Sequence, residues 1–61
     1  MGMETIAKLK NSLRSIDLAL EYINKVKRET ADDTLKRKLR NSVDELEQAK
    51  RAIQASIKDI Q

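Results

Sequence analysis

The chain contains no cysteine, histidine, proline, tryptophan or phenylalanine, and only one glycine and one tyrosine. Without cysteine there is no disulfide framework, so nothing indicates an oxidising compartment. Because histidine and cysteine are both missing, the Ser–His and Cys–His arrangements of nucleophilic catalysis are excluded. A chain with no proline and one glycine also lacks the residues that usually mark the turns of β-hairpins. The absences therefore argue against those enzyme classes and against a β-sheet fold.

Long apolar runs are missing as well. No stretch approaches the roughly 20 apolar residues that a membrane-spanning helix needs. No charged segment followed by an apolar one indicates a secretory signal. We therefore expect a cytoplasmic protein.

The sequence does contain two apolar stripes with helical spacing. The first has the alternating three- and four-residue steps of a helix that packs on another helix. It consists of Ile6, Leu9, Leu13, Ile16, Leu20 and Ile23. The second stripe is two positions, or about 200° of helix, away from the continuation of the first. It consists of Leu35, Leu39, Val43, Leu46, Ala49, Ile53, Ile57 and Ile60. One straight helix cannot bury both stripes against one partner, so the sequence predicts an all-α fold, an antiparallel two-helix hairpin.

The hairpin is expected to be a single domain over residues 1–61, with helices at about 4–28 and about 31–60 and a turn at about 29–31. The segment from Thr30 to Asp33 fits a capping box, in which the Thr30 oxygen accepts from the Asp33 amide. Asp32 or Asp33 is the alternative cap. A connection this short brings the two helices back antiparallel.

Three further residues have expected positions beside the stripes. Lys36 and Lys50 lie one heptad to either side of a seam valine and are expected to run their stems along the edge of the core. Tyr22, one residue from the first stripe, is expected to pack its ring at the core boundary.

A lone hairpin leaves the outer side of each seam open to water, and a chain this short needs further burial to be stable. We therefore expect a homodimer that forms a four-helix bundle through coiled-coil seams. Its function would be that of a non-enzymatic structural or interaction module. The residues expected to form the oligomer interface are Ile6, Leu9, Leu13, Ile16, Leu20, Ile23, Leu39, Val43, Leu46, Ile53 and Ile57.

Positive charge gathers around the predicted turn. Residues 25–40 hold seven basic and three acidic residues, a net of +4, whereas the rest of the chain holds six basic and seven acidic ones. An alternative function is therefore a small dimeric regulator that binds RNA or DNA phosphates, and peripheral contact with an anionic membrane is a further option. No aromatic residue interleaves with the basic ones, so base stacking is unsupported. The basic residues concerned are Lys25, Lys27, Arg28, Lys36, Arg37, Lys38 and Arg40.

The acidic residues fall largely outside the apolar stripes, where solvated faces with neighbouring charge pairs are the expected arrangement. A carboxylate metal site in a helical bundle needs inward-facing glutamates, usually with histidine. We predict no catalytic residue, no cofactor and no metal site.

From Leu9 to Ile57 the chain resembles a small helical-hairpin family of endospore-forming Firmicutes, domain-of-unknown-function family 1657. The similarity is carried by Lys10 and Leu13 in the first helix, by the turn segment 30–36, which is similar to a Thr-x-Asp-x-x-Ala-Lys pattern, and by Leu46 and Ile53. The chain departs from the family in being rich in lysine and arginine rather than glutamine. The resemblance implies a sporulation-associated protein, present in the cytoplasm or the spore, with no known catalytic activity. It supplies no site residues.

Overall fold

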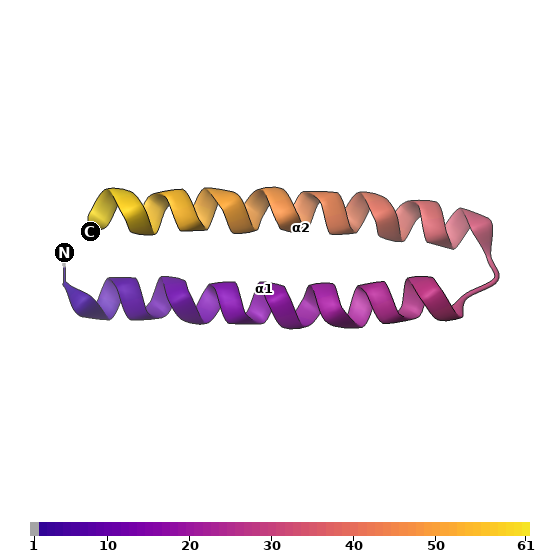
Figure 1. Cartoon of the computed structure of the whole chain (residues 1–61), viewed down its shortest axis with the longest axis horizontal. Coiled ribbons are helices and arrows are strands. Elements are labelled where there is room, and N and C mark those ends of the chain that lie inside the picture. The colour runs from indigo at the N-terminus through magenta and orange to yellow at the C-terminus, as the bar shows by residue number, and fades with distance from the viewer. Residues whose placement is uncertain (1) are drawn as a thin grey trace.

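The computed structural model describes residues 2–61 and contains two helices and no strand within that range. Helix α1 spans Met3–Glu29 and helix α2 spans Asp33–Ile60. The two helices run side by side in opposite directions, so the ends of the chain meet at one end of the molecule and the turn lies at the other (Figure 1). The predicted all-α, two-helix hairpin is confirmed.

The turn occupies three residues, and Asp32 rather than Thr30 caps α2. The Asp32 carboxylate accepts a hydrogen bond from the Leu35 amide at 3.1 Å. The Thr30 hydroxyl accepts instead from the Asp32 amide at 3.2 Å. The predicted capping box is therefore wrong and the alternative cap at Asp32 is the one that forms. A threonine whose hydroxyl bonds two residues ahead forms a turn of its own and leaves the next acidic residue to cap the helix.

The facing row of α1 follows the predicted stripe and continues beyond it. All six apolar residues of that stripe are half-buried. Lys27 and Thr30, which continue the same spacing, are half-buried too. Near the turn the helices therefore face each other through polar side chains, because the apolar part of the row ends at Ile23.

The facing row of α2 agrees with the predicted stripe at six of its eight positions and differs at two. Leu35 and Ala49, assigned to the stripe from the sequence, are exposed, and Lys36 and Lys50 are half-buried in their place. The steps of three and four residues that connect the other members fix one facing angle, and positions 36 and 50 fall on it. The row consists of Lys36, Leu39, Val43, Leu46, Lys50, Ile53, Ile57 and Ile60.

The core between the two helices is thin. Only Val43 and Ile57, each 7% exposed, are buried among the described residues. The hairpin is long and flat, with principal extents of 46 × 15 × 9 Å. It is one layer of two helices, whereas stable domains pack two layers around a core.

Candidate association surface

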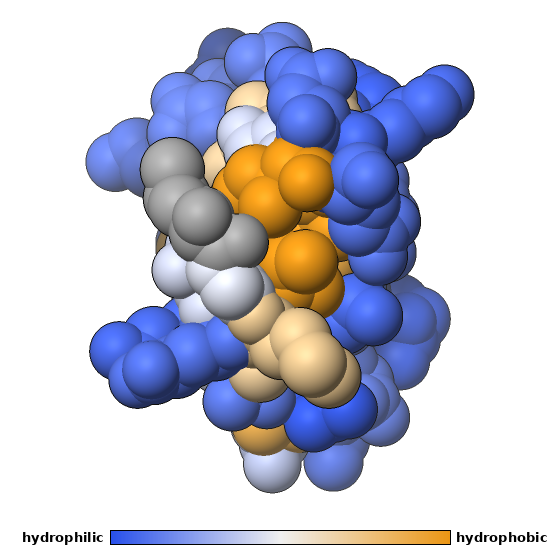
Figure 2. All heavy atoms as spheres, turned by 90° about the vertical axis from the view of Figure 1, so that its left-hand side faces the viewer, coloured by the Kyte–Doolittle hydropathy of each residue, from blue (hydrophilic) through white to orange (hydrophobic). Residues whose placement is uncertain are grey.

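The residues predicted to form the oligomer interface line the contact between α1 and α2. Of the eleven, Val43 and Ile57 are buried and the other nine are half-buried. Seen from the end where the termini lie, apolar atoms gather between the helices, and hydrophilic side chains frame them above, below and on the right-hand side (Figure 2). The seam thus holds one hairpin together, and each half-buried residue keeps part of its surface uncovered.

Five large apolar side chains of the two helices lie outside this seam and are open to water: Met3, Leu18, Tyr22, Val26 and Leu35. Tyr22 is 61% exposed, so the prediction that its ring packs at the core boundary is wrong for the single hairpin. Val26 and Leu35 are also exposed, on either side of the turn. Leu18, which lies off the stripe, is exposed as its position predicts.

One ion pair joins the two helices across the seam. The Lys50 ammonium lies 2.7 Å from an Asp17 carboxylate oxygen, and about a third of the lysine side chain is exposed. This is the expected geometry for a lysine at a core position, whose stem covers apolar surface while its charge reaches water and an acid. The other ion pair of residues 2–61 joins Glu4 and Lys8 within α1 at 3.4 Å, where both side chains are largely exposed.

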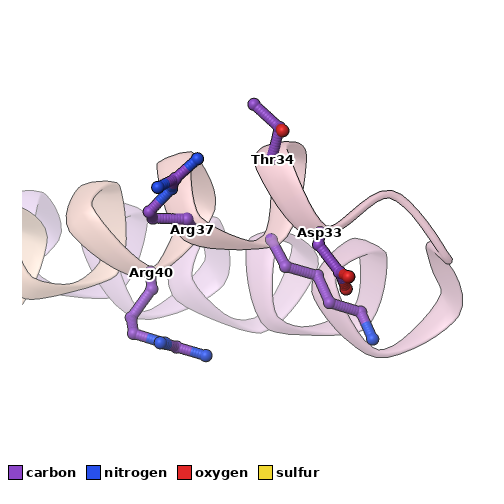
Figure 3. Close-up of a pocket in the computed structure, with 5 residues that line it drawn as sticks. Asp33, Thr34, Arg37 and Arg40 are labelled. Atoms are coloured by element: carbon purple, nitrogen blue, oxygen red, sulfur yellow. The ribbon is translucent and has the colours of Figure 1, made fainter.

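The basic residues near the turn do not converge on one point. An open depression of about 410 Å³ is lined by Asp33, Thr34, Lys36, Arg37 and Arg40. In Figure 3 the guanidinium groups of Arg37 and Arg40 point away from each other. The remaining four, Lys25, Lys27, Arg28 and Lys38, lie on the last turns of α1 and the first of α2. The depression is an exposed, positively charged surface and not an enclosed site.

A second hollow of about 320 Å³ lies where the termini meet, lined by Met3, Ile6, Ala7, Lys10 and Gln61. It is the open end of the seam. Within the described part of the chain, no group of three metal-ligating side chains comes together. Neither helix there is long and apolar enough to cross a membrane.

The half-buried positions of Lys27 and Thr30 in the facing row of α1 were not predicted, whereas the half-buried positions of Lys36 and Lys50 agree with the expectation that their stems run along the edge of the core. The signal for the first two was present in the spacing, because they continue the three- and four-residue steps of the α1 row. Lys27 and Thr30 were left out of the predicted stripe because they are polar.

Comparison with known proteins gives no relative: the chain matches no protein family, no curated protein and no solved structure.

Proposed function

We propose that this protein is a non-enzymatic association module and that two copies pack their hairpins together as a four-helix bundle. The observation that carries the proposal is the surface that one hairpin leaves uncovered. The chain exposes 4826 Å², whereas a folded monomer of 7.0 kDa is expected to expose about 4,000 Å². The excess, about 800 Å², is the area that each partner buries in a protein interface of standard size.

The burial pattern supports the same proposal. Nine of the eleven seam residues are only half-buried, and five large apolar side chains outside the seam are exposed. A second hairpin laid against the first would turn one layer into two and cover the open side of the seam together with the exposed apolar side chains on the face where it lies. The α1 stripe is widened by Ala19 and Val26 on one side, as in helices that touch two neighbours.

Sedimentation equilibrium at micromolar concentration tests the proposal. We expect a mass of twice the 7.0 kDa of the chain, with dissociation on dilution. The helical ellipticity should fall over the same range of concentration, because the hairpin alone has only two buried residues. A well-folded monomer at all concentrations contradicts the proposal.

A second candidate function is binding of nucleic acid at the basic turn end. One observation favours it: both ion pairs of residues 2–61 lie elsewhere, so none of the seven basic side chains at this end is paired with an acid. Phosphates would neutralise this charge. Affinity for RNA or DNA should fall steeply with added salt and weaken in Arg37→Glu. Absence of binding at low salt eliminates this candidate, and vesicles of anionic lipid test the membrane alternative.

The sporulation-associated role that the family resemblance implies stays a prediction. It is tested by whether the protein accumulates during sporulation and is retained in the spore.

A further inference from the structure

The two sides of the hairpin differ in charge. Two antiparallel helices are related by a 180° rotation about an axis perpendicular to the plane that contains both of them. This rotation exchanges the helices but keeps each face of that plane in place, so equivalent heptad positions of α1 and α2 lie on the same face of the hairpin. Each heptad has two facing residues, and the first of them is Ile6, Leu13, Leu20 or Lys27 in α1 and Lys36, Val43, Lys50 or Ile57 in α2. The residues that immediately precede these first facing residues therefore form one lateral face of the hairpin. We name it the uncharged face. It consists of Thr5, Ser12, Ala19 and Val26 from α1 and Leu35, Ser42, Ala49 and Ser56 from α2.

The opposite lateral face carries charge of both signs. Its residues come immediately after the second facing residue of each heptad, for example after Leu9 in α1 and after Leu39 in α2. They include Lys10, Asp17, Arg40 and Glu47. The ion pair between Asp17 and Lys50 lies on this side. This position agrees with the heptad assignment, because Lys50 is the first facing residue of its heptad and lies on the side of α2 that is next to the Asp17 row of α1.

Three of the four hydroxyl groups of the uncharged face, those of the serines, are already satisfied by their own helices. The hydroxyls of Ser12, Ser42 and Ser56 each donate to the backbone carbonyl four residues earlier, at 3.1, 3.2 and 3.0 Å. Covering a hydroxyl that keeps its hydrogen bond costs much less than covering one that loses its water. The same face holds the exposed side chains of Val26 and Leu35. It is therefore the lateral surface that a second protein layer would cover at least cost.

We infer that the uncharged face is where a second copy of this chain docks, an inference that rests on the proposed dimerisation. The charge of the chain favours a second copy over a partner of opposite charge as the occupant of this face. The chain carries a net charge of +3, and in a two-fold interface each patch meets its own copy, so any net charge on the patch repels itself. A face with no charged residue avoids this repulsion. A partner of opposite charge would instead be matched by the opposite face or the turn end.

Matched glutamate substitutions test the choice of face. Ala49→Glu and Ser12→Glu place a carboxylate on the uncharged face, one from each helix. Gln54→Glu places the same group on the opposite face, and Ala55→Glu places it on the outer side of α2; all four parent side chains are exposed in the hairpin. We expect the first two to weaken dimerisation by about a hundredfold or more in sedimentation equilibrium. The other two should dimerise like the parent chain.

Failure of the inference about the docking face and failure of the proposed dimerisation give different results. If the parent chain is a dimer and Gln54→Glu dissociates it while Ala49→Glu and Ser12→Glu do not, the inference is wrong and the proposed dimerisation stands. Four dimeric variants likewise overturn the inference alone. A monomeric parent chain overturns both.

A second measurement applies if the glutamate variants lose their helicity. The chain has no cysteine, so Ala49→Cys and Ala55→Cys each provide a single small thiol. As protein concentration rises, alkylation of the Ala49→Cys thiol by iodoacetamide should slow in proportion to the remaining monomer fraction, whereas Ala55→Cys should keep its rate. Equal rates at all concentrations overturn the inference.

Discussion

Asp32 begins α2 with a single side-chain hydrogen bond, from the Leu35 amide at 3.1 Å. We predict that Asp32→Ala lowers the free energy of unfolding by about 1 kcal/mol, the usual loss for an N-cap, and that Asp32→Asn largely preserves it. The control is Asp33→Ala in the first turn, which removes only a favourable charge at the helix terminus, worth a few tenths of a kcal/mol. Urea denaturation at one protein concentration measures all three. Equal losses for Asp32→Ala and Asp33→Ala would contradict the cap.

Lys50 is a charged residue in a row of otherwise largely apolar facing residues, with its side chain one third exposed and paired to Asp17. Lysine at such a position usually fixes register at a cost in stability. We predict that Lys50→Leu raises the free energy of unfolding by about 1 kcal/mol, because the buried leucine contributes more than a half-exposed ion pair.

The matched control for that substitution is Lys58→Leu, at an exposed position of the same helix. It should change stability by less than about 0.5 kcal/mol. The two are compared by urea denaturation at the same concentration. A loss of stability in Lys50→Leu larger than in Lys58→Leu would show that the ion pair contributes more than the side chain's packing.

At the scale of the helices, the number, direction and approximate ends of α1 and α2 were predictable, since the stripes demand a hairpin and acidic residues mark the start of the second helix. The angle at which α2 faces α1 was predicted less well. Leu35 and Ala49 were assigned to the row because they are apolar, although Lys36 and Lys50 have the better spacing. A long lysine stem can cover apolar surface as an aliphatic residue does, so polarity alone misplaces such positions.

Leu13 lies near the middle of the facing row of α1 and is half-buried. We predict that Leu13→Asp removes both the helicity and the association of the chain, because it costs a core contact and places a carboxylate in the seam, together more than about 3 kcal/mol. Asn11→Asp changes the net charge equally at an exposed position of α1 and should leave both unchanged. Far-UV circular dichroism and sedimentation equilibrium give the two readings. Full ellipticity in Leu13→Asp would count against the seam.

For the whole molecule, the sequence predicts a partner but not the side on which we propose that it docks. Each helix has one flanking row without charge and one with charge, but a single helix does not show which rows of the two helices share a face. The antiparallel arrangement of the two helices (Figure 1), taken with the heptad positions, brings the two uncharged rows onto one face and the charged rows onto the other. Which biological context the protein serves depends on molecules outside the chain, so neither the stripes nor the charge distribution determines it.

The net charge of +3 gives association and nucleic-acid binding opposite responses to salt. Two copies that dock through an uncharged face still repel each other through the rest of their charge, and this repulsion is screened as the Debye length falls from about 30 Å at 0.01 M to about 8 Å at 0.15 M salt. For two net charges of +3 roughly 15 Å apart in water, this screening lowers the repulsion energy by about 1 kcal/mol. We therefore predict dimerisation roughly fivefold tighter at the higher salt.

Binding of phosphates at the turn end would instead weaken over the same range, because each neutralised phosphate releases a condensed counterion. Sedimentation equilibrium of the protein alone and fluorescence anisotropy of a labelled oligonucleotide measure the two responses in the same buffers. Dimerisation that weakens as salt rises would contradict docking through an uncharged face, since only an interface held by opposite charges loses affinity in this way. The sign of the salt effect therefore tests whether the two copies meet through neutral or through charged residues.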